Sequence, residues 1–202
     1  MFGTDFGDVI ETILVRRSIR AYGQGQIEDD QLERILLCGL YAPSSGGRQL
    51  ARFMVIQDAD RMDRLNEIIR NSLLRQQPAA GSMRSKGVLR AQQEGYRFAY
   101  GAPTLICAIA PRAFENAMAD CACALENMLI ACESLGLSAC WSNQTHWLTG
   151  EPELRAVFEE LGMGTEEDIF GAIAVGRRLR ESSPPAAERV AGRVIRDKLI
   201  KS

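Results

Sequence analysis

Apolar residues return every three or four positions in five stretches of the chain, which is the spacing of one helix face. The predicted helices span residues 6–14, 28–40, 60–74, 118–135 and 153–161. Glu28, Asp29 and Asp30 support the start of the second helix, because acids are favoured at its positive N-terminal end. The fourth helix is apolar on nearly all sides. We therefore expect it to be buried, either in the domain or in a subunit interface.

Four shorter apolar runs predict strands, at residues 53–56, 104–110, 137–141 and 169–175. Continuous apolar runs of this length are typical of buried strands. Helices and strands are intermixed along the chain, which favours an α+β domain of three layers. A length of 202 residues favours one domain, covering residues 1–202.

Two segments lack this periodicity. Residues 76–93 gain Gln, Pro, Gly and Ser, and they predict a long mobile loop or lid with room for a little helix. After Gly176 the chain becomes polar and contains Pro184 and Pro185, so residues 176–202 are predicted to form an extended arm.

The composition narrows the class of protein. A net charge of -2 gives no electrostatic case for nucleic-acid binding, and no stretch approaches the roughly 20 apolar residues of a membrane helix. The N-terminus carries acids rather than a signal peptide. The six cysteines form no Cys-x-x-Cys pair and lie in apolar runs, so we expect reduced thiols in a cytoplasmic protein.

Several catalytic arrangements are disfavoured by the residues present. The single histidine, His146, excludes a site with several histidine ligands. A Ser-His-Asp triad would need His146, but the chain has no Gly-x-Ser-x-Gly turn, so we expect a wall or surface histidine. Cys121 and Cys123 would diverge on a helix, which argues against a cluster-ligand pair.

The densest candidate site is the run of Arg16, Arg17, Ser18, Ile19 and Arg20. Guanidinium groups match phosphate oxygens in a bidentate way and stay charged at all relevant pH values. Taken alone, the run also fits a solvated helix C-terminus, where cations are favoured. A second candidate is the loop over residues 42–49, whose glycines and serines suit close approach of a ligand but also suit an ordinary helix-ending loop.

Together these segments resemble the nitroreductase family of FMN-dependent oxidoreductases. The likeness covers nearly the whole chain in the correct order, although each motif alone is weak. Its motifs are Arg16 to Tyr22, Ala42 to Gln49, Gly101 to Pro103, Asp120 through Asn127 to Ala131, Gly136-Leu137, and Gly171 to Gly176.

The resemblance implies an intertwined homodimer with two FMN molecules, each held by both subunits. It implies a mixed, largely antiparallel sheet flanked by helices, and a C-terminal arm that reaches onto the partner. Arg16 and Ser18 would hold the FMN phosphate and ribityl chain, with Arg17 assisting, and Arg189 would reach the phosphate. Arg20 would lie near the flavin N1 and O2 edge, where a cation favours the anionic reduced flavin.

Other roles follow from the same likeness. The partner's FMN would be contacted by Pro43, Ser44, Ser45 and Gly47. The isoalloxazine would be lined by Trp141, Ser142, Asn143 and Gln144, with a backbone N–H near Gln144 facing the reactive N5. Asn71 is the candidate for the flavin N3 and O4 edge.

The chain departs from the family pattern at three places, which bear on the substrate class. Gly47 stands where many members have Asn, Leu50-Ala51 where many have Pro-Trp, and Asn143 where some have an acid.

The leading hypothesis is an oxidoreductase that passes hydride equivalents from NAD(P)H through FMN to a nitroaromatic, a quinone or a similar acceptor. The protein would orient the cofactor and tune its electrostatics. The alternative is a flavin-binding or flavin-processing protein without nicotinamide-driven turnover. Neither hypothesis needs a metal, nucleic acid or a membrane.

Overall fold

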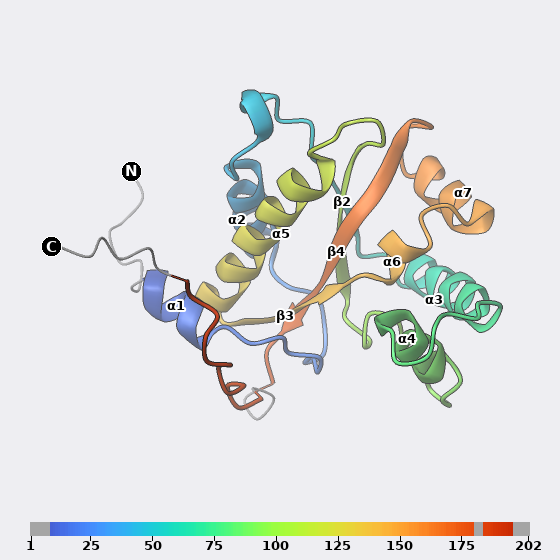
Figure 1. Ribbon diagram of the computed structural model, residues 1–202, viewed down its shortest axis with the longest axis horizontal. Coiled ribbons are helices and arrows are strands. Elements are labelled where there is room, and N and C mark those ends of the chain that lie inside the picture. Colours follow the sequence, from blue (N-terminus) through green and yellow to red (C-terminus); the bar gives the residue numbers. More distant parts are fainter. Residues whose placement is uncertain (1–8, 180–183, 196–202) are drawn as a thin grey trace, which may run out of the picture.

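The computed structural model describes residues 9–179 and 184–195 (Figure 1). In chain order its elements are α1 (Val9–Val15), α2 (Asp29–Leu40), the short 3-10 helix η1 (Ser45–Gly47), β1 (Arg52–Ile56), α3 (Ala59–Leu74), α4 (Met83–Ala91), β2 (Thr104–Pro111), α5 (Ala117–Ser134), β3 (Leu137–Ser142), α6 (Gln144–Trp147), α7 (Pro152–Glu160) and β4 (Glu167–Arg177).

The four strands form one sheet in the order β1-β2-β4-β3. Every pairing among the described strands is antiparallel, so the mostly antiparallel sheet is confirmed and this part of the chain holds no parallel pair. In the register, Ala172 of β4 lies between Cys107 of β2 and Ser142 of β3. The central strand β4 therefore pairs with β2 on one side and with the edge strand β3 on the other.

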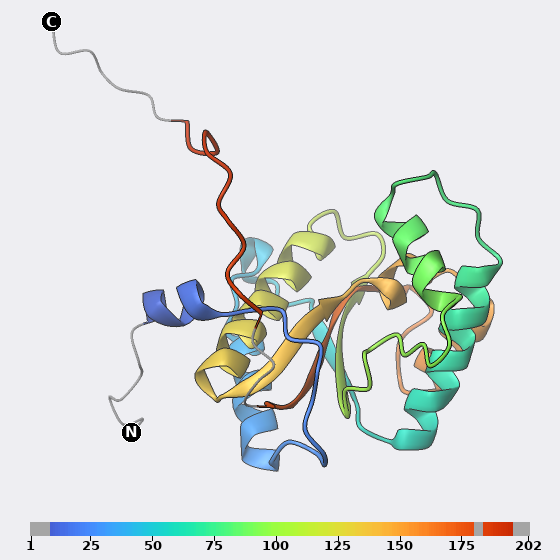
Figure 2. The same ribbon diagram turned by 90° about the horizontal axis from the view of Figure 1, so that it is seen from below.

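Helices cover both faces of the sheet (Figures 1 and 2). On one face α2 and α5 enclose a core that includes Ile35, Leu125 and Met128. On the other face α3, α4 and α7 enclose a core that includes Leu65 and Phe158. The predicted three-layer α+β domain is confirmed, because each face of the sheet must bury its apolar side chains against helices.

Residues 76–93 are less irregular than predicted. Half of this segment is helix α4, which begins after Ser82, whose side chain accepts a hydrogen bond from the Ser85 N–H and caps the helix. Gly87 and Ala91 bury its inner face. Helix α4 could not be predicted from hydrophobic periodicity, because Arg84, Ser85 and Lys86 interrupt the apolar period. The gating role assigned to the segment stays a prediction.

The long helix α5 is only partly buried within its own chain. One side is buried and includes Cys121, Leu125 and Met128, whereas Met118 and Cys123 are exposed. The helix therefore has more apolar residues than it buries against the sheet.

The short helix α6 was not predicted at all, because four residues are too few for a periodic pattern. The predicted first helix begins at residue 6, and its residues 6–8 lie outside the described part.

An ion-pair cluster fixes the start of β4. The Asp168 carboxylate accepts hydrogen bonds from Arg112 Nε at 2.9 Å and from Arg155 Nη1 at 2.8 Å. Partial burial acts to raise the pKa of Asp168, but hydrogen bonds and charge from the two arginines outweigh it, so the pKa lies below its usual range. Asp168 thus joins β4 to α7 and to the segment after β2.

We expect Asp168→Asn to lower the free energy of unfolding by about 1–2 kcal/mol at neutral pH, because charged hydrogen bonds are lost and Arg155 remains largely buried. A lowered folded-state pKa stabilises the protein above the unfolded-state pKa, and this contribution is lost as the pH falls below about 4. Urea unfolding at pH 7 and pH 3 measures both effects, and the difference between parent and variant should be smaller at pH 3 than at pH 7.

Asp63→Asn is the matched control, since Asp63 pairs with Arg97 at the surface, where its side chain is 62% exposed. Exposed pairs contribute little, so this variant should differ from the parent by less than about 0.5 kcal/mol. Equal losses in the two variants would contradict the role of the cluster.

Candidate functional site

The arginine run lies along the outer edge of β3. The Ile19 N–H donates to the Ala139 carbonyl at 3.0 Å, and Ile19 is 1% exposed. Further on, Tyr22 forms an isolated bridge with Arg178 at the end of β4. Residues 16–22, which we call the β3-edge segment, are therefore held by main-chain pairing and one buried anchor, and the neighbouring side chains are only partly buried or exposed.

The positive charge of this segment is poorly neutralised. Arg16 Nε lies 3.5 Å from the carboxylate of Glu126, and this is the segment's one ion pair within the described chain. Arg17 donates only to the carbonyls of Leu14 and Arg16, at 2.8 Å each, so the helix C-terminus interpretation fits Arg17. Arg20 donates to the Ser18 carbonyl at 3.3 Å. Three guanidinium groups are thus accompanied by one acid among the described residues, a charge balance that suits an anionic ligand.

The chain turns sharply where β3 ends, and this turn holds the other predicted residues. Trp141 Nε1 donates to Asn143 Oδ1, and the Trp147 N–H donates to the Asn143 carbonyl at 2.8 Å. The Ser142 hydroxyl is buried and has no hydrogen-bond partner among the described residues. A buried unpaired hydroxyl is costly, so it marks a place where a ligand or water completes the structure. Residues 141–145 are called the β3 turn below.

Two aromatic side chains connect the β3-edge segment to the β3 turn. The Arg20 guanidinium lies 5.5 Å from the ring centre of Tyr100, and the Tyr96 hydroxyl donates to Gln144 Oε1. Arg90 of α4 joins the two rings, because it lies 4.3 Å from the ring centre of Tyr100 and 5.8 Å from that of Tyr96. The structure thereby brings Arg20 and Gln144 into one continuous cluster.

Sequence reasoning missed Arg90, Tyr96 and Tyr100. Arg90 lies in the segment that was predicted to be a loop, and the tyrosines lie between two predicted elements. A signal did exist: two of the four tyrosines of the chain occur within five residues, shortly after an arginine. The structure itself also singles out Tyr100, since its φ of 58° is in the left-handed region that non-glycine residues rarely adopt.

The loop over residues 43–49 lies elsewhere. The Ser45 N–H and hydroxyl both bind the carboxylate of Asp120, the hydroxyl at 2.8 Å, at the first turn of α5. Gly47 has a φ of 67°, a conformation that glycine and asparagine adopt more readily than other residues, which explains the exchange of these two types here. Ser45 therefore anchors the loop, with its polar groups already occupied.

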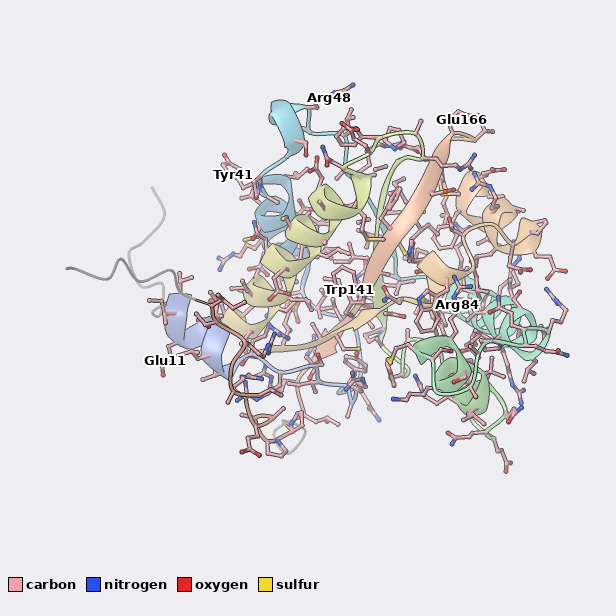
Figure 3. All side chains as sticks on the ribbon, in the orientation of Figure 1. Glu11, Tyr41, Arg48, Arg84, Trp141 and Glu166 are labelled. Atoms are coloured by element: carbon pink, nitrogen blue, oxygen red, sulfur yellow. The ribbon has the colours of Figure 1, made fainter. Side chains whose placement is uncertain are left out.

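This loop and the arginine run are separated within one chain. Figure 1 shows η1 beside the N-terminal end of α5 and α1 beside its C-terminal end. Figure 3 likewise places Arg48, next to the loop, at the edge of the molecule and Trp141 near its middle. Pro43, Ser44, Ser45 and Gly47 therefore do not meet the β3 turn of their own chain.

Two further predicted residues also stand apart. Asn71 is exposed on α3 and lines a hollow there with Arg70 and Tyr96. Arg189 lies in the described stretch 184–195, which extends away from the domain as the predicted arm (Figure 2). Among the described residues, neither side chain forms a hydrogen bond or an ion pair with the β3 turn.

Four of the six cysteines, Cys107, Cys121, Cys132 and Cys140, are buried, and the histidine is held by a main-chain contact. All six thiols are free, and burial raises the pKa of Cys121 to about 12 and raises that of Cys140, next to Tyr22, as well. Thiols with raised pKa values are poor nucleophiles at neutral pH. His146 Nδ1 donates a hydrogen bond to the Ile169 carbonyl at 2.7 Å, and the ring stacks on Phe170.

Residues 9–179 and 184–195 hold neither a cluster of metal ligands nor a membrane-spanning helix. Nowhere in these ranges do three His, Cys, Asp or Glu side chains gather as potential metal ligands. Every helix in the same ranges falls short of the length and hydropathy that a bilayer crossing needs.

Comparison with known proteins agrees with this geometry. Residues 13–177 match the family model described as "Nitroreductase family". A curated protein of Archaeoglobus fulgidus, named "Putative NADH dehydrogenase/NAD(P)H nitroreductase", is 26% identical over 172 residues, which is 84% of this chain and 84% of that protein.

Solved structures share the fold. A nitroreductase of Bacteroides fragilis with bound FMN is 32% identical, with a TM-score of 0.85, covering 95% of this chain and 100% of that one. A nitroreductase of Desulfitobacterium hafniense with bound FMN is 19% identical, with a TM-score of 0.81 over 95% of this chain and 99% of that one. The family model spans the domain from α1 to β4, and both candidate segments lie within it. This chain therefore belongs to the nitroreductase family.

Proposed function

We propose that this protein binds FMN between the β3-edge segment and the β3 turn. The observation that carries the proposal is the concentration of Arg16, Arg17 and Arg20 against a single acid, in a chain of this family. A phosphate monoester carries up to two negative charges and suits such an array. The residues present fit the cofactor in a second respect. The buried Ser142 hydroxyl lacks a hydrogen-bond partner in the described chain, and a polar atom of the bound cofactor would supply one.

Residue roles follow from position along β3. Arg16, Arg17 and Ser18 are proposed to hold the phosphate and ribityl chain, and Arg20 the pyrimidine edge of the flavin. The isoalloxazine is proposed to lie against Trp141, Ser142, Asn143 and Gln144. Trp141 lies close over β4 because Gly171 has no side chain: a Cβ there would lie 2.6 Å from the indole ring. Asn71 and Arg189 remain candidates for the N3 edge and for the phosphate.

A second subunit is proposed to complete the site. The loop containing Pro43, Ser44, Ser45 and Gly47 cannot meet the β3 turn of its own chain, but in a homodimer it can meet that of the partner. The apolar side chains of α1 are between 48% and 66% exposed. Met118 and Cys123 of α5 are exposed as well. Exposed apolar helix faces of this kind are typical of subunit interfaces.

The proposed reaction is the transfer of hydride equivalents from NADH or NADPH to an acceptor such as a nitroaromatic or a quinone. Bound FMN would supply the redox chemistry by accepting a hydride and then passing on two electrons. The chain supplies the rest. Arg20 stabilises negative charge at the pyrimidine edge, Gln144 and its backbone N–H bind at the reactive edge, and the cluster of Tyr96, Tyr100 and Arg90 shields that side from water.

The decisive experiment is anaerobic mixing of the FMN-loaded protein with NADH or NADPH. Loss of the yellow flavin absorbance within seconds supports the oxidoreductase. A flavin that stays oxidised with both nicotinamides, yet is reduced by dithionite, would instead support flavin binding without nicotinamide turnover.

We predict that the protein is a dimer in solution with about one FMN per chain. An obligate interface formed by α1 and α5 should bury more than about 2,000 Å². Light scattering combined with flavin absorbance measures both quantities. A monomer that retains stoichiometric FMN would contradict the shared site.

We predict that Arg16 and Arg20 act on different properties. Arg16→Ala removes a charge-assisted contact of about 1.5–3 kcal/mol, so FMN affinity should fall roughly ten- to more than a hundredfold, as measured by fluorescence titration. Arg20→Gln should lower the midpoint potential by some tens of millivolts, because about 30 mV corresponds to 1.4 kcal/mol for two electrons. A dye-coupled redox titration with saturating FMN measures this shift.

Arg34→Ala is the control for both variants, since Arg34 is an exposed arginine whose only ion pair in the described chain is with Asp30 at 3.9 Å. It should leave affinity and potential unchanged. An unchanged potential in Arg20→Gln would show that Arg20 does not face the pyrimidine edge.

A further inference from the structure

The β3 turn has few restraints from its own side chains. Asn143 is held locally by Trp141, and the Ser142 hydroxyl has no partner in the described chain. From a distant segment, the Tyr96 hydroxyl donates a hydrogen bond to Gln144 Oε1 in this turn. Both partners are buried, with Tyr96 8% and Gln144 6% exposed, so water competes weakly for this bond.

The Tyr96 hydroxyl is suited to a fixed donor role. Burial raises the pKa of Tyr96 to about 12, while the charge of Arg90 and the bond to Gln144 act to lower it. The hydroxyl therefore keeps its proton at any working pH. With its oxygen bound by Tyr96, the Gln144 amide has one orientation, and its N–H groups face away from Tyr96.

Tyr96 is itself held from α4. Arg90 lies over the rings of Tyr96 and Tyr100 and donates to the Tyr100 hydroxyl at 2.9 Å. The same helix contacts α6 directly, because a Cβ at Gly87 would lie 3.2 Å from the Trp147 ring. The chain of contacts thus runs from α4 through Tyr96 to Gln144, the first residue of α6.

We propose that Tyr96 is a positioning residue for the flavin reaction: its hydroxyl fixes the Gln144 amide and so holds the β3 turn in the geometry that faces the reactive edge of FMN. This inference rests on the proposed function, and it adds a residue that the arginine run and the β3 turn do not contain. Tyr96 acts through Gln144 and has no contact with the reacting atoms assigned to it.

The test compares Tyr96→Phe with the parent protein, both loaded with FMN. The variant loses only the hydroxyl, so FMN affinity should stay within about threefold. The absorption band of bound flavin should shift and reduction by nicotinamide should slow about three- to tenfold, which is the loss expected from one hydrogen bond. Ser72→Ala is the matched control, because it removes a buried hydroxyl that accepts a hydrogen bond from Arg75 and lies outside the proposed FMN site.

A double-mutant cycle with Gln144→Leu separates positioning from general packing. If Tyr96 acts through Gln144, Tyr96→Phe should have no further effect in the Gln144→Leu background. An unchanged band and rate in Tyr96→Phe, or equal losses in both backgrounds, would overturn the proposal. Gln144→Leu removes the same bond from its other end, so it provides the test should Tyr96→Phe fail to fold.

The outcomes also separate this inference from the proposed function. A parent protein that binds no FMN overturns both. A parent that binds FMN but is not reduced by nicotinamide overturns only the turnover, since the band shift and a dithionite-based midpoint potential still decide the role of Tyr96.

Discussion

Both parts of the candidate site depend on the absence of a side chain at two glycines of the central strand β4, Gly171 and Gly176. At Gly171 a Cβ would lie 2.6 Å from the Trp141 ring, and at Gly176 one would lie 2.9 Å from the Tyr22 ring. Real atoms do not approach so closely, so any larger residue would push these rings away. Trp141 fixes the β3 turn and Tyr22 the β3-edge segment. Two glycines on one strand thereby set the spacing between the proposed phosphate end and the reactive end.

In the candidate site, the charged groups lie on one segment and the hydrogen bonds that fix geometry lie on another. The β3-edge segment concentrates guanidinium groups that have little compensation from acids, which suits recognition of a phosphate. The β3 turn has almost no charge and depends on hydrogen bonds from Trp141 and Tyr96. Arg20 is the link, because it belongs to the charged segment yet lies over Tyr100 at the other end. Affinity and reactivity are therefore expected to respond to different residues.

A single chain presents only part of the proposed site. The loop anchored by Ser45 on Asp120 lies at the far end of α5, and α1 and α5 both expose apolar side chains. A helix that covers the sheet with one face and remains largely apolar on the other supports the proposal of a second copy. The family likeness gave the same expectation, and geometry now supplies its physical reason.

The sequence by itself determined the order of elements and the charged half of the site. Periods of 3.6 and continuous apolar runs located α2, α3, α5, α7 and the four strands to within two residues, because each must bury one face or both. Tertiary structure alone decided the rest. Helix α4 depends on Ser82 capping and on burial of Gly87, and α6 on the Asn143 turn, neither of which gives a periodic signal. The cluster of Arg90, Tyr96 and Tyr100 joins residues distant from β3 in sequence, and only packing against the sheet brings Tyr96 to Gln144.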